Sequence, residues 1–553
     1  MAKAESTYRT AYDMAGRQRD ISVSEFFLKN RHLLGFDSPS KALLTTVKEA
    51  VDNALDACEE AGVLPEIHVE VFDDWDGIFR VVVEDNGPGI LENQIARIFG
   101  KLLYGSRFHK LSQSRGQQGM GISAAGMYAQ LTTGKSLHVI SRVEGEPMAS
   151  ELYVSIDTAR NRPELHGKKK IKWDRPHGTR VEAEMEGRYP KGFHSIAMYL
   201  KQTAIANPYV TFHYKGPRDE EVSYTRSSTE LPPRPTEIKP HPRGVELGRL
   251  IQMLNNTSSR TLLKFLENEF SRVGRKTAQE IVEHAGRKLT ERSLPKRIAH
   301  VQARALYRAI RKVPVSAPRM DCVVPIGEQR LYEGMRKEID ADFYIVKTRP
   351  PAVYRGNPFQ VEVGLAYGQP GGAGLAVDEG GRIHKTAHPK REAAEALTLH
   401  ADQPAQLLRF ANRVPLLYEQ GGCAITRAVL QTRWRSYGLQ QPKGALPIAP
   451  MVILVHLASV WVPFTSEAKE AIAPYPEIIK ELKLGLQACA RKLAEHLRQE
   501  SRLKREYVKR SHIEKYLPHV GIALQQILEL SDVQRDQSVA RLHEVLDQTR
   551  KLP

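Results

Sequence analysis

The sequence is poor in cysteine, with four cysteines in 553 residues. They are Cys58, Cys322, Cys423 and Cys489, and no two of them form a C-x-x-C pair. Disulfide-rich secreted domains contain many cysteines and zinc knuckles contain closely spaced pairs, so neither class is indicated. This cysteine usage fits a reducing compartment, and we expect a cytoplasmic protein.

Long hydrophobic runs are also missing. The longest apolar stretch, residues 451–462, is shorter than the roughly 20 residues that a membrane-spanning helix needs, and it contains His456. The first ten residues, MAKAESTYRT, lack the apolar core of a signal peptide. We therefore expect no membrane partner.

Two common phosphate-binding motifs are absent from the glycine-rich segment at residues 116–121. The order of its glycines is G-x-x-G-x-G, whereas the dinucleotide fingerprint is G-x-G-x-x-G. The segment also lacks the G-K-[S/T] of a Walker motif. These differences argue against a Rossmann fold and against a P-loop fold.

Positive charge is what the sequence has in excess. It contains 81 Lys and Arg against 64 Asp and Glu, which gives a formal net charge of +17. Such a charge favours a polyanionic partner, because neutralising phosphates releases their counterions. We expect nucleic acid as this partner, with an anionic membrane surface or a basic proteome background as the alternatives.

The chain is too long for one hydrophobic core, so several domains are expected. Helical and strand-like patterns alternate up to about residue 230, with a helix over residues 40–61 and strands over 67–72 and 78–83. This alternation predicts an α/β sandwich. The proline-rich segment 231–242, LPPRPTEIKPHP, resists regular structure and is the best domain boundary.

A small helical module follows the proline-rich segment, with helical patterns over residues 260–270 and 277–285. Strands return from residue 311, and the clearest lie over residues 361–367 and 451–462.

Two long helical patterns close the sequence, over residues 476–503 and 512–551. The predicted domains are therefore residues 1–230, 231–310, 311–475 and 476–553.

A carboxylate and an amide lie four residues apart in the predicted helix 40–61. They are Glu49 and Asn53, and this spacing puts both side chains on one helix face. A carboxylate can take a proton from an attacking water, and an amide oxygen is a hard ligand that suits Mg²⁺. The pattern E-x-x-x-N is weak alone, and a solvated helix face is the default alternative.

An aspartate and two glycines follow the predicted strand 78–83, in the sequence EDNGPGI. Asp85 can accept a hydrogen bond from an exocyclic amine such as that of adenine, and Gly87 and Gly89 let the backbone approach a ligand closely. A plain turn is the alternative, because D-N-G is a strong turn signal.

The glycine-rich segment precedes an apolar helical pattern. Glycines before a helix leave backbone N–H groups that cradle phosphate together with the helix dipole. The candidate phosphate-binding residues are Gly116, Gln117, Gln118, Gly119, Met120, Gly121, Ile122 and Ser123. Thr179, in a later H-G-T ahead of a strand, would supply a hydroxyl near the adenine.

In their order and spacing these motifs resemble the GHKL ATPase superfamily, which includes gyrase and sensor histidine kinases. The resemblance implies ATP and Mg²⁺ as cofactors. Glu49 then corresponds to the general base, Asn53 to the Mg²⁺ ligand and Asp85 to the adenine-binding residue, and the glycine-rich segment corresponds to the phosphate-binding lid. Upstream of the lid, Ser106 and Arg107 are expected to contact the nucleotide.

Longer phrases resemble one family of this superfamily, the topoisomerase VI B subunits, over nearly the whole chain. They are KEAVDNALDA, GQQGMGIS, ANPYVTF, RGNPFQVEVGLAY and FANRVPLLY. The resemblance implies a multidomain α/β fold. Its parts are a GHKL (Bergerat) α/β sandwich ATPase domain, a small helix-two-turn-helix domain and an α/β transducer domain with long C-terminal helices.

The same resemblance implies a function. It describes the ATP-hydrolysing subunit of a type IIB DNA topoisomerase, which forms a homodimer on ATP binding and captures double-stranded DNA. A separate A subunit, in an A₂B₂ heterotetramer, cuts the DNA, and the complex relaxes and decatenates it. We find no clear context for a nucleophilic tyrosine in this chain, which fits cleavage by the A subunit. The expected location is the cytoplasm, in association with the nucleoid.

Lys469 matches a lysine of the transducer in this family, which lies on a loop between a strand and a helix and reaches the γ-phosphate of ATP. A compact ammonium on a flexible stem suits a retractable phosphate contact. The gyrase loop reads Q-T-K, whereas Glu467 and Ala468 precede the lysine here, so only the lysine is carried over. An ordinary exposed lysine is the alternative.

Two clusters are candidate DNA contacts. Basic residues surround Gly274 in a turn between two predicted helices, where they can meet phosphates. A second cluster resembles a W-K-x-Y-like motif of the family's transducer. The candidates are Arg272, Arg275 and Lys276 in the first cluster and Trp434, Arg435 and Tyr437 in the second. For the first cluster a plain solvated turn is equally open, and for the second ordinary packing is.

Three other classes of protein stay open from the sequence. A sensor kinase would normally have a phospho-accepting helix pair before the ATPase domain, but few residues precede Glu49. A mismatch-repair or chaperone ATPase would lack the helical insert and the phrases after residue 350. A non-enzymatic DNA-binding scaffold stays possible if Glu49 is not aligned for catalysis.

Overall fold

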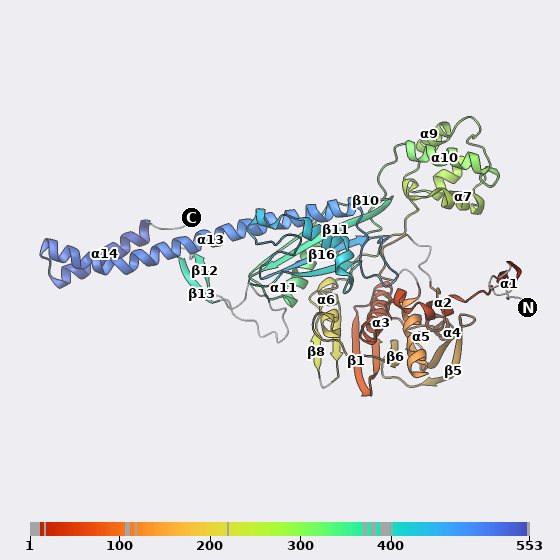
Figure 1. The fold of residues 1–553 in the computed structure, drawn as a ribbon, viewed down its shortest axis with the longest axis horizontal. Coiled ribbons are helices and arrows are strands. Elements are labelled where there is room, and N and C mark those ends of the chain that lie inside the picture. Colours follow the sequence, from red (N-terminus) through yellow and green to blue (C-terminus); the bar gives the residue numbers. More distant parts are fainter. Residues whose placement is uncertain are drawn as a thin grey trace, which may run out of the picture.

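The structure is a computed structural model, and Figure 1 shows an α/β unit, a helical module, a second α/β unit and a long helical stalk. We call these the first unit, the helical module, the second unit and the stalk. The structure describes residues 11–15, 18–105, 111–116, 119–217, 220–368, 373–377, 383–387, 399 and 402–549.

The first unit is built on an eight-stranded sheet with the order β5-β4-β3-β6-β2-β1-β7-β8. Only the pair β1 and β7 is parallel, and the other neighbours are antiparallel. The strands are β1 (Glu66–Trp75), β2 (Ile78–Asp85), β3 (Leu137–Arg142), β4 (Ala149–Asp157), β5 (Arg162–Ile171), β6 (Gly178–Glu186), β7 (Thr211–Lys215) and β8 (Glu221–Tyr224). The predicted strands 67–72 and 78–83 are confirmed as β1 and β2.

Helices cover one face of this sheet. They include α3 (Pro39–Ala61), α4 (Glu92–Gly100), α5 (Gly121–Thr133) and α6 (Ile196–Ala206), while α1 (Ala11–Ala15) and α2 (Val23–Lys29) precede them. Successive side chains of a strand point to opposite faces of the sheet. On β1, Ile67, Val69 and Val71 are buried against the helices. Their neighbours Glu66 and His68 are only half-buried on the other face.

The predicted helix 40–61 is confirmed as α3, and both of its ends have a local cause. Ser38 caps the first turn by accepting a hydrogen bond from the backbone N–H of Lys41 at 3.4 Å. The helix ends at Gly62, which has a φ of 77°, in the left-handed region that glycine favours.

The helical module contains α7 (Leu247–Asn256), α8 (Leu262–Glu269), α9 (Arg275–Ala285) and α10 (His300–Lys312). The predicted helices 260–270 and 277–285 are confirmed as α8 and α9. Leu250, Phe265 and Leu306 lie in a separate hydrophobic cluster between these helices. Residues 231–241, which connect the first unit to the module, have no regular secondary structure, as predicted.

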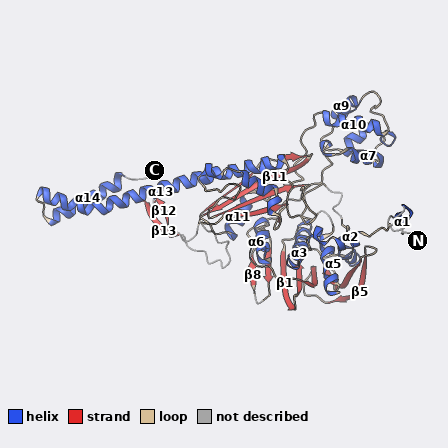
Figure 2. Ribbon diagram, in the orientation of Figure 1, coloured by secondary structure: helices blue, strands red, loops and turns tan. Residues whose placement is uncertain are grey.

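The second unit has a sheet with the order β10-β11-β16-β14-β15, with β9 paired to β11. Its strands are β9 (Phe343–Thr348), β10 (Ala352–Tyr354), β11 (Asn357–Tyr367), β14 (Gln406–Ala411), β15 (Val414–Pro415) and β16 (Met451–Ser459), beside a hairpin of β12 (Ala373–Val377) and β13 (Ile383–Ala387). The predicted strand 361–367 is confirmed as part of β11, and the predicted strand 451–462 is confirmed as β16 except for residues 460–462, because β16 ends at Ser459. Helices lie on both faces of this sheet (Figure 2), so every residue of β16 is buried.

Three helices pack on the sheet of the second unit, and the last of them continues into the stalk: α11 (Glu328–Glu338), α12 (Ala424–Gln431) and α13 (Pro476–Leu528). The first half of α13 packs on the sheet through Ile478, Leu482 and Leu486, which belong to the same hydrophobic cluster as β11 and β16. A domain boundary at residue 475 therefore separates α13 from the sheet that it covers.

The prediction of a break between residues 503 and 512 is wrong, because α13 is one helix of 53 residues. Residues 504–511 contain no glycine or proline, so nothing in them interrupts the helical hydrogen bonds. The helix ends at Glu529, which adopts a left-handed φ of 50°, and α14 (Asp532–Thr549) folds back on it. None of the described helices combines the length and apolar character needed to cross a membrane.

Candidate active site

Glu49 lies on α3 against the start of α5. A Cβ atom added to Gly121, the first residue of α5, would lie 1.8 Å from Oε2 of Glu49. Only glycine leaves room for the carboxylate at this position, and the positive end of the helix dipole favours a negative charge there. The structure therefore brings the predicted base and the predicted lid together.

Asn53 lies one helical turn after Glu49 and is exposed. No hydrogen bond joins its side chain to another of the described residues. An exposed amide oxygen beside a carboxylate is a suitable donor for a hard cation that keeps most of its waters, so the residues present fit Mg²⁺.

Asp85 is the last residue of β2 and pairs with Thr179 of β6. Its Oδ1 accepts a hydrogen bond from the backbone N–H of Gly87 at 2.8 Å. Burial raises the pKa of Asp85 to about 7, against the opposing effect of the N–H groups of Gly87 and Thr179. A Cβ atom at Gly87 would lie 2.8 Å from the same oxygen, so the glycine leaves this carboxylate accessible.

Ser141 of β3 also belongs to this corner and is not predictable from the sequence. Its hydroxyl donates to the carbonyl of Gly178 at 3.0 Å and lies 3.0 Å from the hydroxyl of Thr179. It also accepts the backbone N–H of Ile90 at 2.8 Å. A lone serine in a strand has no recognisable pattern, and only the pairing of β3 with β6 brings it here.

Several side chains of the predicted lid lie in the protein interior, so these residues can offer only backbone groups to a ligand. Met120 and Ile122 are buried in the core of the first unit, so only their backbone groups can face a ligand. The hydroxyl of Ser123 lies 2.9 Å from the carbonyl of Ile98 and thus ties α5 to α4. Gly119 has a left-handed φ of 57°. Ser106, Arg107, Gln117 and Gln118 lie outside the described residues.

Lys469 of the second unit reaches the lid. Its Nζ donates to the backbone carbonyl of Arg115 at 3.1 Å, directly before the lid residue Gly116. The side chain is buried, with 8% of the residue exposed, so the alternative of an ordinary exposed lysine is wrong.

The loop 111–116 makes further contacts with the second unit. The amide of Asn412 donates to the carbonyl of Ser114 at 3.0 Å, and the backbone N–H of Val324 donates to the side chain of Gln113 at 2.7 Å. The lid is therefore fastened to the second unit by backbone and side-chain hydrogen bonds from several elements.

Arg115 is a site residue that sequence reasoning missed. It is 5% exposed, and its guanidinium binds Asp56 of α3 at 2.8 Å and the hydroxyl of Tyr209 at 2.9 Å. It also pairs with Glu59, and Arg413 of the second unit lies 3.5 Å from that same carboxylate. A buried arginine with several partners is costly to disrupt, because any partner that is removed leaves a charge uncompensated.

A cavity of about 430 Å³ lies beside this ion cluster. Asp56, Glu59, Arg115 and Arg413 line it together with the proline-rich residues 232–235, whereas Glu49, Asn53 and Asp85 do not. The cavity therefore borders the junction between the two units and not the predicted nucleotide residues.

Asp52 is buried next to Glu49, with 4% of the residue exposed. Neither of its carboxylate oxygens has a hydrogen-bond partner among the described residues. Burial raises the pKa of Asp52 to about 7, although Lys48 opposes the shift.

The two candidate DNA clusters have different surroundings. Arg275 and Lys276 start α9 and are exposed, as is Arg272, whose Nε donates to the carbonyl of Ala317. Trp434 is fully buried, and its indole N–H donates to the carbonyl of Val429 at 3.0 Å. The prediction of DNA contact is therefore wrong for Trp434, whose ring packs in the core of the second unit.

The other members of the second cluster lie nearer the surface. Arg435 is exposed, and its Nε donates to the carbonyl of Gln441, while Tyr437 is half-buried against the core of the second unit. The exposed Arg435 is accessible for contact with DNA, whereas Tyr437 mainly packs against the core of the second unit.

The fold and this arrangement define an ATPase unit of the GHKL class joined to a second α/β unit. The model of the family "Histidine kinase-, DNA gyrase B-, and HSP90-like ATPase" matches residues 39–185, and that of "Topoisomerase VI B subunit, transducer" matches residues 318–509. These matches confirm the predicted fold class and show a nucleotide-binding ATPase unit followed by a transducer.

Relatives that match nearly the whole of this chain identify one family within this class. The chain is 47% identical to the B subunit of type 2 DNA topoisomerase 6 from Methanococcoides burtonii, over 94% of this chain and 79% of the relative. It is 45% identical to the protein of the same name from Archaeoglobus fulgidus, over 96% of this chain and 83% of the relative. The chain belongs to the family of topoisomerase VI B subunits, the ATP-driven B subunits of type IIB DNA topoisomerases. A sensor kinase and a mismatch-repair or chaperone ATPase are thereby excluded.

Proposed function

We propose that ATP closes two copies of this chain into a dimer that traps double-stranded DNA, and that hydrolysis reopens the dimer through Lys469. The observation that carries this proposal is the hydrogen bond from Lys469 to the carbonyl of Arg115. A ligand shifts a conformational equilibrium only if it binds the two states differently. A γ-phosphate at the lid would compete with this carbonyl for the lysine ammonium, so nucleotide would change a contact between the two units.

The proposed chemistry assigns one task to each predicted residue. Glu49 accepts a proton from the attacking water. The backbone N–H groups at the start of α5 bind phosphate oxygens, and Asp85 accepts a hydrogen bond from the adenine amine. Asn53 would hold Mg²⁺, which when bound neutralises charge on the phosphates.

The position of Glu49 supports this assignment. The carboxylate lies at the same helix start that would bind phosphate, which places a base next to the reacting group. Because a carboxylate and a phosphate repel each other, productive binding needs positive charge from Lys469 and the metal.

The ion cluster at the junction supports a mechanical link between the lid, α3 and the second unit. Arg115 joins the lid to α3 through Asp56 and Glu59, and Arg413 adds the second unit to the same cluster. A lid that moves with the nucleotide would carry these contacts with it. The ion pair between Lys41 and the buried Glu470 adds a second connection between α3 and the loop of Lys469.

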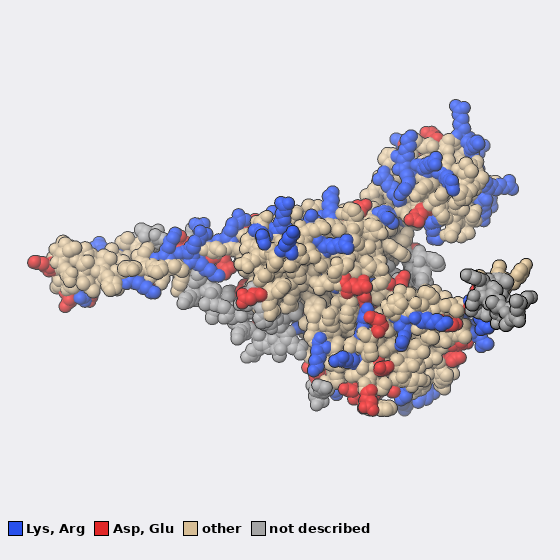
Figure 3. Space-filling view, viewed as in Figure 1, with Lys and Arg blue, Asp and Glu red and all other residues tan. Residues whose placement is uncertain are grey.

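The proposed DNA-binding surface is the helical module. Residues 245–313 contain fifteen Lys and Arg against six Asp and Glu, a net charge of +9. Figure 3 shows these side chains spread over the outer surface of the module. Arg272, Arg275 and Lys276 lie in this region and remain the proposed contacts there, and Arg435 is the one proposed contact in the second unit. Phosphate contact without base reading would make the binding sensitive to salt.

The proposed contact with the A subunit lies in the stalk. The far half of α13 and α14 expose large apolar side chains, among them Tyr516, Ile527, Leu528 and Val533. A helical hairpin with this much exposed apolar surface is typical of an interaction site. Two such contacts in an ATP-closed dimer would give the A₂B₂ assembly, working on DNA in the cytoplasm at the nucleoid.

The four-part division of the chain also stays a proposal. The first unit, the helical module and the second unit each have their own hydrophobic cluster, which supports independent cores. The packing of α13 on the second unit argues for moving the last boundary from residue 475 into the stalk.

The experiment that tests the gate measures ATP turnover and dimerisation in the full chain, with and without duplex DNA. Glu49→Gln should lower turnover by about a hundredfold or more while dimerisation with a non-hydrolysable ATP analogue persists. Glu144→Gln, at an exposed turn, is the matched control and should behave as wild type. If wild type neither hydrolyses ATP nor dimerises with the analogue, the gate is refuted and a DNA-binding scaffold becomes the better interpretation.

A further inference from the structure

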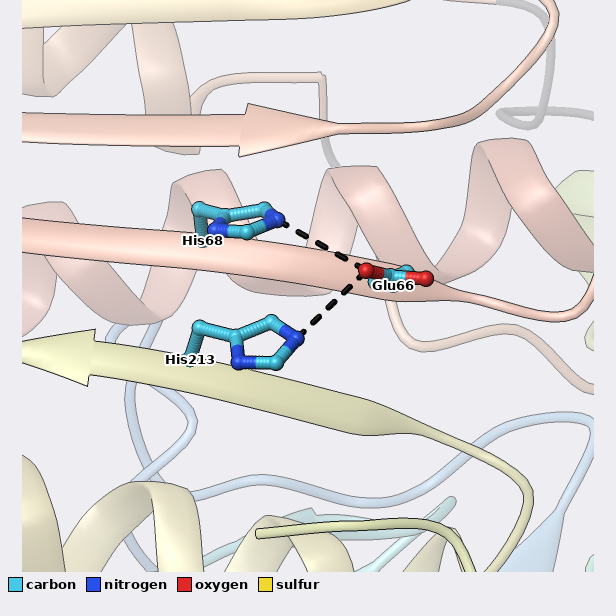
Figure 4. Close-up of side chains that lie close together, drawn as sticks. All are labelled: Glu66, His68 and His213. Atoms are coloured by element: carbon cyan, nitrogen blue, oxygen red, sulfur yellow. Dashed lines mark ion pairs between the residues drawn. The ribbon is translucent and has the colours of Figure 1, made fainter. Parts of the chain in front are cut away.

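Two histidines and a glutamate lie together on the face of the first sheet that the helices leave uncovered. Glu66 and His68 are two residues apart on β1, so their side chains point to the same face. His213 of β7 is the register partner of His68 in the parallel pair. Figure 4 shows both imidazole rings directed toward the Glu66 carboxylate.

The distances in this cluster match a metal site. Nε2 of His213 lies 3.4 Å from Oε1 of Glu66, and Nε2 of His68 lies 3.8 Å from the same oxygen. One nitrogen or oxygen atom from each of the three residues lies within 4.8 Å of the others. A tetrahedral zinc ion with bonds of about 2.0–2.1 Å places neighbouring ligand atoms about 3.3 Å apart. A small closing movement would therefore bring the three donors to bonding distance.

We propose that Glu66, His68 and His213 form a binding site for Zn²⁺ or a similar divalent transition-metal ion that links β1 to β7. Imidazole ligands favour Zn²⁺, Ni²⁺ or Cu²⁺ over Mg²⁺ and Ca²⁺, which prefer sites made of oxygen donors. Three protein ligands at a half-exposed position leave a fourth place for water. The site is separate from the nucleotide residues, because it lies on the opposite face of the sheet from α3 and α5.

The surrounding residues orient both imidazoles for this role. Nδ1 of His213 lies 3.2 Å from the hydroxyl oxygen of Ser223, which can accept a hydrogen bond from Nδ1–H and so leave the lone pair on Nε2. Nη2 of Arg175 lies 3.1 Å from Nε2 of His68, so that nitrogen accepts a hydrogen bond and carries a lone pair.

Arg175 is a competitor that the metal must displace. It has a second partner, because its Nε donates to Glu84 at 2.8 Å, so it can release His68 without losing that ion pair. Arg226 also lies 4.0 Å from Glu66. Removing Arg175 should therefore strengthen metal binding.

The test is a titration of the untagged full chain with Zn²⁺ after removal of metals by a chelator, without nucleotide. Calorimetry should give one Zn²⁺ site per chain. When Co²⁺ replaces Zn²⁺, its visible absorption spectrum should be that of a cobalt ion with a low coordination number. His213→Ala should weaken binding by more than about tenfold, and Ser223→Ala by about tenfold. Arg175→Ala should tighten it severalfold. The melting temperature of each variant without metal reports whether it folds.

His300→Ala is the matched control, because His300 is an exposed histidine of the helical module. It should bind Zn²⁺ as wild type does. The proposal is overturned if wild type shows no site at micromolar Zn²⁺. It is equally overturned if a folded His213→Ala variant binds as tightly as wild type, or if Arg175→Ala binds no more tightly.

Discussion

At the scale of single residues, two carboxylates of α3 have opposite surroundings. Glu49 rests against the N-terminal end of α5, where a helix dipole and a glycine accommodate its charge. Asp52, three residues later, is buried without a hydrogen-bond partner among the described residues. Burial of the Asp52 carboxyl raises its pKa and so favours its protonated form.

Gly121→Ala tests the place of Glu49. The new methyl group would overlap the carboxylate, which is the flexible end of a side chain and can move away. We expect a small change in melting temperature but a loss of ATP turnover of about a hundredfold, because the base leaves its position. Gly248→Ala, where the added Cβ meets nothing within 4 Å, is the control and should keep full turnover. Normal turnover in Gly121→Ala would contradict the assignment of Glu49.

Asp52→Asn tests the buried acid through the pH dependence of stability. A carboxyl group whose pKa rises from 3.8 unfolded to about 7 folded stabilises the fold below pH 4, and this stabilisation is lost as the pH rises through 7. The variant should therefore be more stable than wild type at pH 8, and the difference should shrink by on the order of 2 kcal/mol at pH 5. Chemical denaturation at both pH values measures it. A difference that does not change with pH would show that Asp52 titrates normally.

At the scale of elements, the start of α9 presents positive charge where a helix dipole already favours an anion. Arg275 and Lys276 are exposed in its first turn, and the nearby acidic residues are few. The start of α9 is thus suited to binding a phosphate, and it presents no pattern of side chains that would recognise a particular base.

The double variant Arg275→Gln and Lys276→Gln should weaken duplex DNA binding by the helical module. Losing two phosphate contacts should lower the slope of log K against log salt by about 2, with equal effects on unrelated DNA sequences. Binding of labelled duplexes over a series of salt concentrations measures the slope. Lys172→Gln, an exposed lysine of the first unit, serves as control, and an unchanged slope in the double variant would remove α9 from the DNA surface.

At the scale of the whole molecule, the proposed nucleotide site and the proposed contact with the A subunit lie far apart along one chain. The lid contacts the second unit through Lys469, the first half of α13 packs on that unit, and the apolar end of the stalk extends away from it (Figure 1). A rotation of the second unit relative to the lid would therefore move the end of the stalk by a larger distance.

Ile527→Asp together with Leu528→Asp should abolish copurification with the A subunit. Both side chains are exposed, at 76% and 60%, so the charges should not unfold the stalk. ATP turnover and analogue-driven dimerisation of the isolated chain should stay normal, since the changes lie far from the lid. Gln534→Asp, on the polar part of α14, is the control. If the double variant still retains the A subunit, the contact lies elsewhere.

Local spacing explains what could be predicted of the site. Glu49 and Asn53 are one helical turn apart, and Asp85 with Gly87 and the lid glycines are short contiguous patterns. The resemblance of its loop identifies Lys469, but only the structure shows its burial at the lid. The predicted break in the stalk is wrong, because long helical patterns do not themselves reveal where a helix ends.

Contacts between distant segments explain what could not be predicted. Ser141 meets Thr179 only because β3 pairs with β6, and Arg115 finds Asp56 and Arg413 only when the lid and the second unit pack on α3. His68 and His213 are 145 positions apart and meet because β1 and β7 are parallel neighbours in register. The sequence by itself determined the helices, the strands and the nucleotide motifs, whose causes are local. Strand order and the packing of the units decided the ion cluster, the burial of Trp434 and the histidine pair, because these depend on residues far apart along the chain.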